Sequence, residues 1–404
     1  MAGATIKRDL RTGRSLWADS AGLTVPVRAL ASAISVDVAI VGAGISGAFM
    51  ALELSKDHSV AVLDRRAPLM GSTMASTALL QWEIDLPLTA LAKKIGAADA
   101  RRAYLRSRQA VDALERIVAE ERIVCGLKDR SSLYLAGDAY GHRALEQEAQ
   151  ARAKIGLDSR YLNAAALRER FGVDRTGAIL STGSASGDPA RLAAGLLRRA
   201  RARGARIWSP VEVLRAVSDP DGVTLLTDAD HAVRARSVVF CCGYEFPRSV
   251  PTPGAAVIST WAMASRPRQR CPAWLRQMLV WEASDPYLYL RMTGDGRLIV
   301  GGEDEPSPTA HQDPVKLKKK CDIIAAKLRR LLPDIAFEID YGWAGAFGES
   351  TTGLPSIGPV EGMDHTWAVM GFGGNGITYS VIASQIVAAE MRGERDPDAD
   401  LYRR

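Results

Sequence analysis

Residues 37–66 read DVAIVGAGISGAFMALELSKDHSVAVLDRR, and their pattern indicates the fold class. Its first apolar run, residues 38–41, is typical of a strand buried on both faces. The glycine-rich turn GAGISG follows, and then a helical pattern that reaches Leu54. A second apolar strand occupies residues 58–63, and Asp64 closes it. A strand, a turn, a helix and a second strand in this order predict a parallel βαβ unit and therefore an α/β fold.

The turn GAGISG has the GxGxxG spacing of a dinucleotide-binding site. Gly42 permits the tight turn, Gly44 leaves room for a pyrophosphate, and Gly47 lets the helix pack closely on the strand. The helix N-terminus then offers unpaired N–H groups to the phosphate charge. At the end of the second strand, Asp64 would accept hydrogen bonds from ribose hydroxyl groups. This unit predicts cofactor contacts at Gly42, Gly44, Ile45, Ser46, Gly47, Asp64 and Arg65.

A second glycine-rich turn lies near the other end of the chain. Residues 353–358 read GLPSIG, residues 366–370 form a short apolar strand, and GFGGNG leads into a helix over residues 377–391. N–H groups at the start of that helix could hold the C2 carbonyl and N1 of a flavin, where negative charge collects on reduction. An NAD enzyme needs no such site, so this turn favours FAD; the alternative is a turn unrelated to any ligand. The contacts predicted here are Gly353, Gly371, Gly373, Gly374, Asn375, Gly376, Ile377 and Thr378.

The composition excludes several classes of protein. With 404 residues, 47% hydrophobic and 24% charged, the chain is typical of a globular protein of two domains rather than a disordered or fibrous one. No apolar stretch approaches the ~18 residues of a membrane-spanning helix. The five histidines and five cysteines are scattered without the spacing of a zinc site, so we expect no metal. Such cysteines are typical of a reducing, cytoplasmic setting.

The positive charge, +6 at pH 7, leaves nucleic-acid binding as an alternative. Its densest runs, residues 198–203 and 316–320, lie in amphipathic helical patterns. We interpret both runs as solvated helix faces and expect no nucleic-acid partner, because neither carries interleaved aromatic residues or a known binding motif.

Taken together, the two ends resemble those of the D-amino-acid oxidase, glycine oxidase and sarcosine oxidase group of FAD-dependent oxidoreductases. The resemblance covers roughly residues 37–391 and rests on the first turn and on GLPSIG…GFGGNGIT. Residues 187–192, GDPARL, resemble a helix start of that family, with Asp188 as the N-cap and Pro189 as the first residue. Residues 238–243, VVFCCG, resemble the strand and turn that return beneath the dinucleotide.

The resemblance implies further contacts with FAD. Residues 71–78, GSTMASTA, resemble the segment that passes the pyrophosphate and reaches the flavin, and their small side chains suit a backbone close to a cofactor. A strand expected over residues 205–213 would end near the adenine. Some relatives attach the flavin through a cysteine in the stretch matching residues 345–350, where this chain has none, so we expect non-covalent FAD. The additional contacts are Gly71, Ser72, Thr73, Ser76, Thr77, Val211, Val213, Cys242 and Gly243.

The resemblance also places the substrate over one face of the flavin. Residues 285–303, DPYLYLRMTGDGRLIVGGE, predict a β-hairpin in which Tyr287, Tyr289 and Arg291 share one face. If that face is the inner one, Arg291 would bind a substrate carboxylate, and Tyr289 and Gln81 would help to position the substrate. The alternative is an outward polar stripe. Several relatives carry a carboxylate-binding Arg in the stretch matching residues 345–350, and its absence here leaves Arg291 as the candidate.

We therefore predict an α/β protein (α+β overall) with a Rossmann-type FAD-binding domain and an interleaved antiparallel-sheet substrate domain. The FAD-binding domain would comprise residues 36–83, 184–250 and 340–395. The substrate domain would comprise residues 84–183 and 251–339, and residues 1–35 would form an N-terminal extension on the surface.

The predicted function is oxidation of a C–N bond in a small amine or amino acid. Hydride transfer to flavin N5 would give an imine that hydrolyses, and oxygen or another acceptor would reoxidise the flavin. Two alternatives stay open: an FAD-dependent 2-hydroxy acid or alcohol dehydrogenase on the same fold, and a non-catalytic FAD-bearing subunit. The sequence leaves the oligomeric state open.

Overall fold

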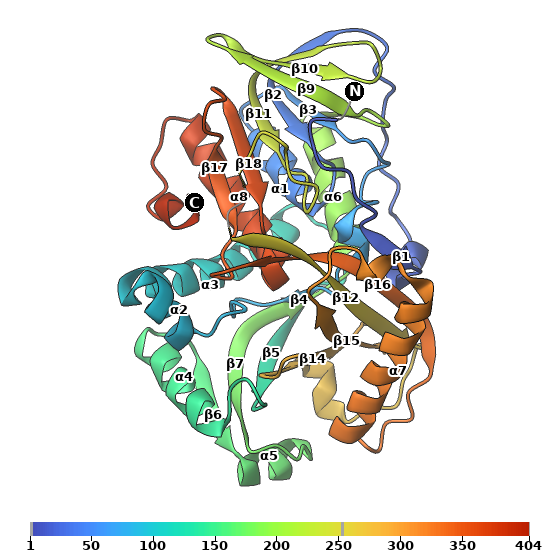
Figure 1. The fold of residues 1–404 in the computed structure, drawn as a ribbon, viewed down its shortest axis with the longest axis vertical. Coiled ribbons are helices and arrows are strands. Elements are labelled where there is room, and N and C mark those ends of the chain that lie inside the picture. Colours follow the sequence, from blue (N-terminus) through green and yellow to red (C-terminus); the bar gives the residue numbers. More distant parts are fainter. Residues whose placement is uncertain (1–2, 252–253, 404) are drawn as a thin grey trace.

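The computed structural model describes residues 3–251 and 254–403, which form two sheets joined by several crossings of the chain (Figure 1). The first sheet brings together strands from both ends of the sequence, and its central strands are parallel because helices connect them. Its strand order is β17 (Ser356–Pro359), β18 (Thr366–Met370), β11 (Val233–Phe240), β2 (Ile34–Val41), β3 (Val60–Leu63) and β8 (Arg206–Trp208). Beyond β11 lie β10 (Gly222–Thr227) and β9 (Val213–Asp219).

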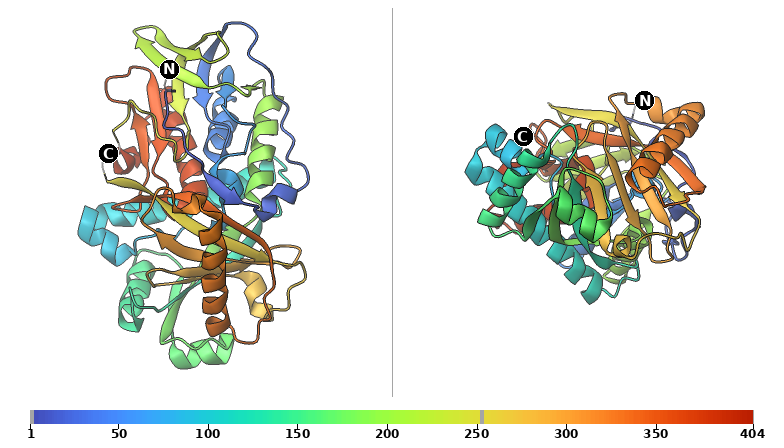
Figure 2. Two further views of the ribbon diagram at one scale, coloured as in Figure 1. Left: turned by 45° about the vertical axis from the view of Figure 1, so that its right-hand side comes forward. Right: turned by 90° about the horizontal axis from the view of Figure 1, so that it is seen from below.

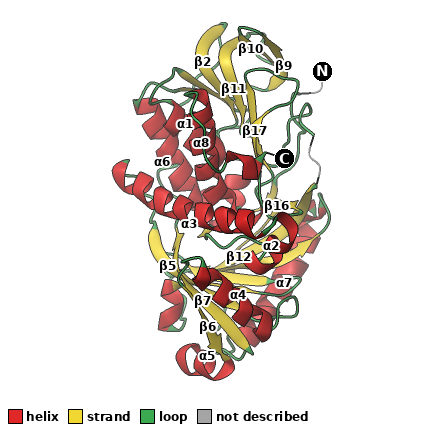
Figure 3. Cartoon of the chain, turned by 90° about the vertical axis from the view of Figure 1, so that its left-hand side faces the viewer, coloured by secondary structure: helices red, strands yellow, loops and turns green. Residues whose placement is uncertain are grey.

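Three helices pack together beside the first sheet: α1 (Ile45–Leu54), α6 (Pro189–Ala202) and α8 (Gly376–Met391) (Figure 3). Both α6 and α8 contact α1, and α3 (Ala97–Glu120) crosses α8. α8 is buried along nearly its whole length, as expected of a helix that is apolar on every side.

The second sheet is mostly antiparallel. Its order is β1 (Arg11–Gly13), β16 (Ile339–Ser350), β12 (Ala255–Ser265), β15 (Leu298–Glu305), β14 (Leu288–Met292), β13 (Met278–Glu282), β5 (Lys128–Leu135), β7 (Gly177–Ser186) and β4 (Leu79–Leu80). β6 (Ser159–Asn163) pairs with β7, and β13 runs parallel to β5.

Helices cover the two ends of this sheet (Figure 2). α7 (Pro314–Leu331) packs on β12, β15 and β16, whereas α4 (His142–Lys154) and α5 (Ala164–Phe171) pack on β6 and β7, and α2 (Leu88–Ile95) contacts α3 and α4. The 3₁₀ turns are η1 (Leu16–Asp19), η2 (Ser72–Ala75), η3 (Ala273–Gln277), η4 (Ala310–Gln312), η5 (Gly373–Asn375) and η6 (Ala399–Tyr402). No helix among the described residues is long and apolar enough to span a membrane.

Most of the predicted local elements are confirmed. β2, α1 and β3 form the parallel βαβ unit, and β18 leads through the second turn into α8. Asp188 caps α6 by accepting N–H groups of Ala190 and Arg191, both at 2.9 Å. β14 and β15 form the predicted hairpin, in which Leu290 pairs with Val300.

The two basic runs lie on α6 and α7, and several of their charges already have partners. In α6, Arg199 donates to the Glu121 carbonyl at 2.5 Å. In α7, Lys316 lies 2.7 Å from Glu305. These contacts fit structural roles for both runs.

Three expectations about the fold require correction. The strand predicted over residues 205–213 ends at Trp208, because Pro210 has no N–H to continue the ladder. β16 pairs with β12 in the second sheet, although we assigned most of it to the FAD-binding domain. The N-terminal extension is not merely on the surface, since β1 joins β16 and the side chains of Leu10 and Trp17 are buried.

Candidate functional site

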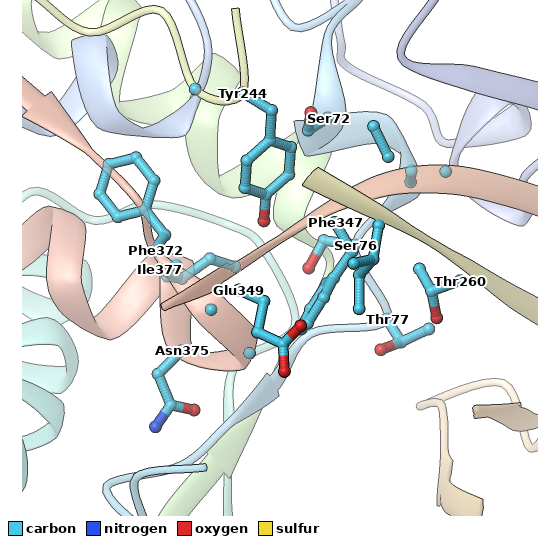
Figure 4. Close-up of a pocket in the computed structure, with 18 of the residues that line it drawn as sticks. Ser72, Ser76, Thr77, Tyr244, Thr260, Phe347, Glu349, Phe372, Asn375 and Ile377 are labelled. Carbon is cyan, nitrogen blue, oxygen red and sulfur yellow. The ribbon is translucent and has the colours of Figure 1, made fainter. Parts of the chain in front are cut away.

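A cavity of about 630 Å³ is lined by residues of both sheets and by both glycine-rich turns (Figure 4). All of the cofactor contacts predicted above line it, with the exceptions of Gly47 and Gly371. Gly47 is instead needed for packing, since a Cβ there would lie 1.9 Å from the Gly42 carbonyl oxygen. Gly371 has a φ of +71° and forms the turn after β18. The structure thus brings the two ends of the sequence into one site.

The first end of the cavity lies where β2 meets α1. Gly42 has a φ of +116°, and a Cβ there would lie 2.3 Å from the Cys241 carbonyl oxygen. This close approach of β11 explains why the turn requires glycine. The first N–H groups of α1 have no intrahelical acceptor, and Gly44, Ile45 and Ser46 line the cavity at that point. An anionic diphosphate suits this helix N-terminus.

Asp64 stands at the end of β3 and faces the same cavity. Its two carboxylate oxygens accept N–H groups of Ala43 and Arg66 at 2.7 and 2.8 Å, while burial raises its pKa. Each oxygen keeps a further lone pair, so the carboxylate can still accept ribose hydroxyl groups. Nearby, Arg66 is held by Glu245 at 2.7 Å.

The segment of residues 71–78 runs along the wall between the two ends. Thr73 Oγ1 accepts the N–H of Ile45 at 3.0 Å, which fastens the segment to α1. The hydroxyl of Ser72 is buried and has no hydrogen-bond partner among the described residues. Ser72, Thr73, Ser76 and Thr77 all line the cavity, and their small polar side chains fit a dinucleotide along this wall.

The second end of the cavity lies where α8 begins. Ser380 Oγ of α8 lies 2.9 Å from Ser46 Oγ of α1, so the two helix starts are neighbours. Asn375 Nδ2 donates to the Glu83 carbonyl at 2.6 Å, and Thr378 Oγ1 donates to the Gln81 carbonyl at 2.9 Å. These bonds hold residues 81–83 against the start of α8. Gln81 lines the cavity, and its Nε2 donates to Ser132 Oγ at 3.2 Å.

Tyr287 and Tyr289 form an aromatic wall of the cavity, with ring centroids 5.7 Å apart. The ring of Tyr289 lies across Gly301 of the next strand, where a Cβ would be 2.2 Å from the Tyr289 hydroxyl. Burial raises the pKa of Tyr289, so its hydroxyl stays protonated near the hydroxyls of Thr77 and Thr260. Tyr289 and Gln81 therefore both line the cavity, and their role in positioning the substrate stays a prediction.

Arg291 does not line the cavity, so the expectation that it binds a substrate carboxylate is wrong. Its side chain is 1% exposed and donates to the carbonyl oxygens of Thr77 and Gly187 at 2.7 and 2.8 Å. Thr77, in the 71–78 segment that lines the cavity, accepts the guanidinium of Arg291 with its carbonyl oxygen. The alternation of side chains along β14 correctly predicted that Tyr289 and Arg291 share a face. It could not predict that the 71–78 segment covers Arg291.

The sequence reasoning missed three carboxylates that line the cavity: Asp85, Asp304 and Glu349. Burial raises the pKa of Asp85 and of Asp304 to about 6 each, and the nearby negative charges add to the shift. Asp304 lies in the acidic run of residues 303–305 at the end of the predicted hairpin, so the sequence could have indicated a negatively charged wall there. Asp85 and Glu349 lie far away in the sequence and only the fold brings them together.

The N-terminal segment was also missed as part of the site. Thr5 and Leu10 line the cavity, and Thr5 Oγ1 accepts a hydrogen bond from Arg65. The N–H of Arg8 donates to Glu245 at 2.8 Å, which ties the segment to the first end of the cavity.

Comparisons with known proteins agree with this site. Gamma-glutamylputrescine oxidoreductase of Escherichia coli (strain K12) is 24% identical over 398 residues, which cover 95% of this chain and 89% of that protein. Glycine oxidase of Geobacillus kaustophilus (strain HTA426) is 26% identical over 369 residues, covering 87% and 92%. Its crystal structure superposes with a TM-score of 0.76, covering 90% of this chain and 96% of that one at 22% identity.

A further solved structure, L-amino acid deaminase from Proteus vulgaris, has a TM-score of 0.77 at 16% identity and covers 94% of this chain and 99% of that one. The family model described as "FAD dependent oxidoreductase" matches residues 37–390. That match spans both glycine-rich turns and every strand of the second sheet except β1. The chain therefore belongs to this family of FAD-dependent oxidoreductases, and FAD is its cofactor.

Proposed function

We propose that the chain oxidises a C–N single bond of a small amine or amino acid. The observation that carries this proposal is one continuous cavity with two chemically distinct ends. One end offers the N-terminus of α1 and Asp64 to a dinucleotide, and the other, where α8 begins, offers Tyr289 and a group of carboxylates to a small molecule. Relatives that act on amines and amino acids support the same reaction class.

In the proposed reaction, the substrate carbon bonded to nitrogen loses a hydride and the nitrogen loses a proton. The C–N single bond becomes a C=N bond, and water then hydrolyses the imine to a carbonyl compound and an amine or ammonia. FAD, when bound, supplies the two-electron acceptor, and oxygen or another acceptor takes those electrons afterwards.

The residues of the chain would act by binding and orientation. The start of α1, together with Ser72 and Asp64, would hold the dinucleotide, and the start of α8 would meet the negative charge of the reduced flavin. Tyr289 would orient the substrate with its protonated hydroxyl, and Gln81 would do so with its side-chain carbonyl oxygen, since its Nε2 donates to Ser132.

We propose that FAD is held without a covalent bond. Cys241 and Cys242 are the cysteines among the described cavity-lining residues, and burial raises the pKa of both thiols. Cys242 lies beside Asp64, at the dinucleotide end, and its thiol donates to the Val41 carbonyl at 3.3 Å. Acid precipitation should therefore leave the yellow colour in the supernatant; colour retained in the pellet would contradict this. All five cysteines are free, which supports a reducing, cytoplasmic location, testable by cell fractionation.

The reaction is tested by mixing the holoenzyme anaerobically with amines, amino acids and 2-hydroxy acids while the flavin absorbance is followed. We expect bleaching by compounds with an oxidisable C–N bond and release of a carbonyl product. Bleaching by hydroxy acids alone, or only on addition of a protein partner, would contradict the proposal.

A further inference from the structure

Three carboxylates at the substrate end of the cavity have no ion-pair partner among the described residues. Asp85 follows β4, Asp304 lies in β15 and Glu349 lies in β16. Asp85 accepts the N–H of Gly374 at 2.8 Å, and Asp304 accepts the Tyr287 hydroxyl at 3.1 Å. The side chain of Glu349 projects into the cavity (Figure 4). Asp85 and Asp304 therefore accept hydrogen bonds from neutral groups, and no cationic side chain among the described residues compensates the charge of any of the three.

These carboxylates lie close enough to repel one another. Burial is the largest cause of the raised pKa of Asp85, and the charge of Glu349 adds to it. Burial also dominates at Asp304, where the charges of both Asp85 and Glu349 contribute. Collecting negative charge in this way is unfavourable unless a cation compensates for it.

One carboxylate oxygen of Asp304 lacks a donor from the protein. Its Oδ1 atom is buried and has no hydrogen-bond partner among the described residues, and Asp304 itself lines the cavity. Buried carboxylate oxygens normally have donors, so the protein compensates the negative charge of Asp304 only in part.

Several other acidic side chains of the same cavity are neutralised by the protein. Glu282 pairs with Arg175 at 2.6 Å, and Glu305 pairs with Lys316 at 2.7 Å. Asp85, Asp304 and Glu349 have no such partner among the described residues, and neither does Asp285, which is an exposed member of the lining. The neighbouring wall is aromatic, with Tyr287, Tyr289 and Phe347 among the lining residues, and ring faces also attract cations.

The cavity offers no comparable site for a substrate carboxylate. Among the described residues that line it, the basic ones are Arg65 and Arg66. Arg65 lies 3.4 Å from Glu212, and Arg66 lies 2.7 Å from Glu245, both at the dinucleotide end. A carboxylate placed near Tyr289 would instead face Asp304, whose negative charge acts on Tyr289.

We propose that the substrate is a diamine, or another amine with a second cationic group, and that Asp85, Asp304 and Glu349 bind that remote cation. This inference rests on the proposed function, because it names the substrate class of the same cavity. One nitrogen is oxidised, and the other remains a bound ammonium group.

The proposal is tested with three compounds of equal chain length: n-butylamine, 1,4-diaminobutane and 4-aminobutanoate. Anaerobic flavin reduction by the holoenzyme gives kcat/KM for each. We expect the diamine to exceed the monoamine by at least about tenfold, the contribution of one hydrogen bond to a charged group. The amino acid should be the poorest of the three. Equal values for monoamine and diamine, or a preference for 4-aminobutanoate, would overturn the proposal.

Two variants locate the effect, and a third is the matched control. Asp304→Asn and Glu349→Gln should each reduce the ratio of diamine to monoamine kcat/KM toward one. Glu305→Gln, next to Asp304 but already neutralised by Lys316, should keep the wild-type ratio. An unchanged ratio in both Asp304→Asn and Glu349→Gln would exclude these carboxylates as the cation site.

A binding measurement separates this inference from the proposed function. Tetramethylammonium has no N–H and cannot give an imine, so its binding to the holoenzyme by calorimetry reports the cation site alone. Binding that weakens in Asp304→Asn, without bleaching by any amine or amino acid, would reject the reaction and keep the site. Bleaching by amines without tetramethylammonium binding and without diamine preference would keep the reaction and reject the site.

Discussion

The Nε atom of Arg291 donates a 2.7 Å hydrogen bond to the carbonyl oxygen of Thr77, and this bond connects β14 of the second sheet to the 71–78 segment that lines the cavity. The guanidinium also reaches the Gly187 carbonyl at 2.8 Å. Burial lowers the pKa of Arg291 to about 9, and the charge of Arg130 adds to the shift. Burying this cation is therefore unfavourable by itself, and the two hydrogen bonds to carbonyl oxygens offset part of that free energy. Arg291 is therefore a positioning residue.

Replacing Arg291 by Met should weaken FAD binding and lower stability, since the carbonyls of Thr77 and Gly187 would lose their donor. An unsatisfied buried carbonyl costs about 1–3 kcal/mol, partly offset here by removal of a buried charge. Arg291→Lys should recover part of both losses, because a shorter cation can still reach one carbonyl. Urea unfolding and FAD titration measure the two effects. If Arg291→Met bound FAD normally and raised KM only for substrates that carry a carboxylate, Arg291 would bind the substrate carboxylate after all.

Trp17 supports the same segment from the N-terminal side. Its Nε1 donates to the Ser76 carbonyl at 2.6 Å, and its ring lies 5.5 Å from the guanidinium of Arg291. Trp17→Phe keeps a ring but loses the N–H, so FAD should dissociate about fivefold faster, as expected for one hydrogen bond. Trp274→Phe is the control, because it changes an indole that packs on Phe171 of α5, beside the second sheet. Equal dissociation rates in the two variants would show that the N-terminal segment does not help to retain FAD.

Gly44 leaves open the space in front of the first helix. A Cβ there would lie 3.2 Å from Thr73 Oγ1, and a valine side chain would extend into the cavity. Gly44→Val should therefore fold but purify without flavin absorbance. Gly141→Val is the control, because a Cβ at Gly141 meets no atom within 4 Å. A yellow Gly44→Val protein would refute the assignment of the diphosphate to this turn.

The raised pKa of Asp304, about 6, makes a prediction about stability with a definite sign. The native state binds this proton more tightly than the unfolded state, so the favourable contribution of the protonated carboxyl is lost as the pH rises through 6. In the absence of substrate, Asp304→Asn should raise the Tm of the holoenzyme at pH 8 by about 1–3 °C, and the gain should vanish near pH 4.

Glu305→Gln is the control of opposite sign. Lys316 lowers the pKa of Glu305, so this carboxylate stabilises the native state at neutral pH and that contribution is lost in acid. The variant should show no gain in Tm at pH 8. A loss of Tm in Asp304→Asn at pH 8 would mean that its carboxylate is satisfied within the protein.

The sequence predicted the structural elements of the dinucleotide end well because the interactions that form them are local. The turn between β2 and α1, the cap at Asp188 and the acid at Asp64 each depend on neighbours within a few residues or on one βαβ unit. The substrate end was predicted poorly. Asp85, Asp304 and Glu349 come from three separate segments, so their common position depends on how the second sheet is assembled. Arg291 shows the same limit, because its partner Thr77 lies 214 residues away.

In the proposed reaction, the bond broken is the C–H bond on the carbon that carries nitrogen. Anaerobic stopped-flow reduction of the flavin tests it with 1,4-diaminobutane and its form deuterated at both nitrogen-bearing carbons. We predict that the deuterated diamine bleaches the flavin more slowly at saturation. Equal rates, or bleaching by 2-hydroxy acids but by no amine or amino acid, would contradict the account.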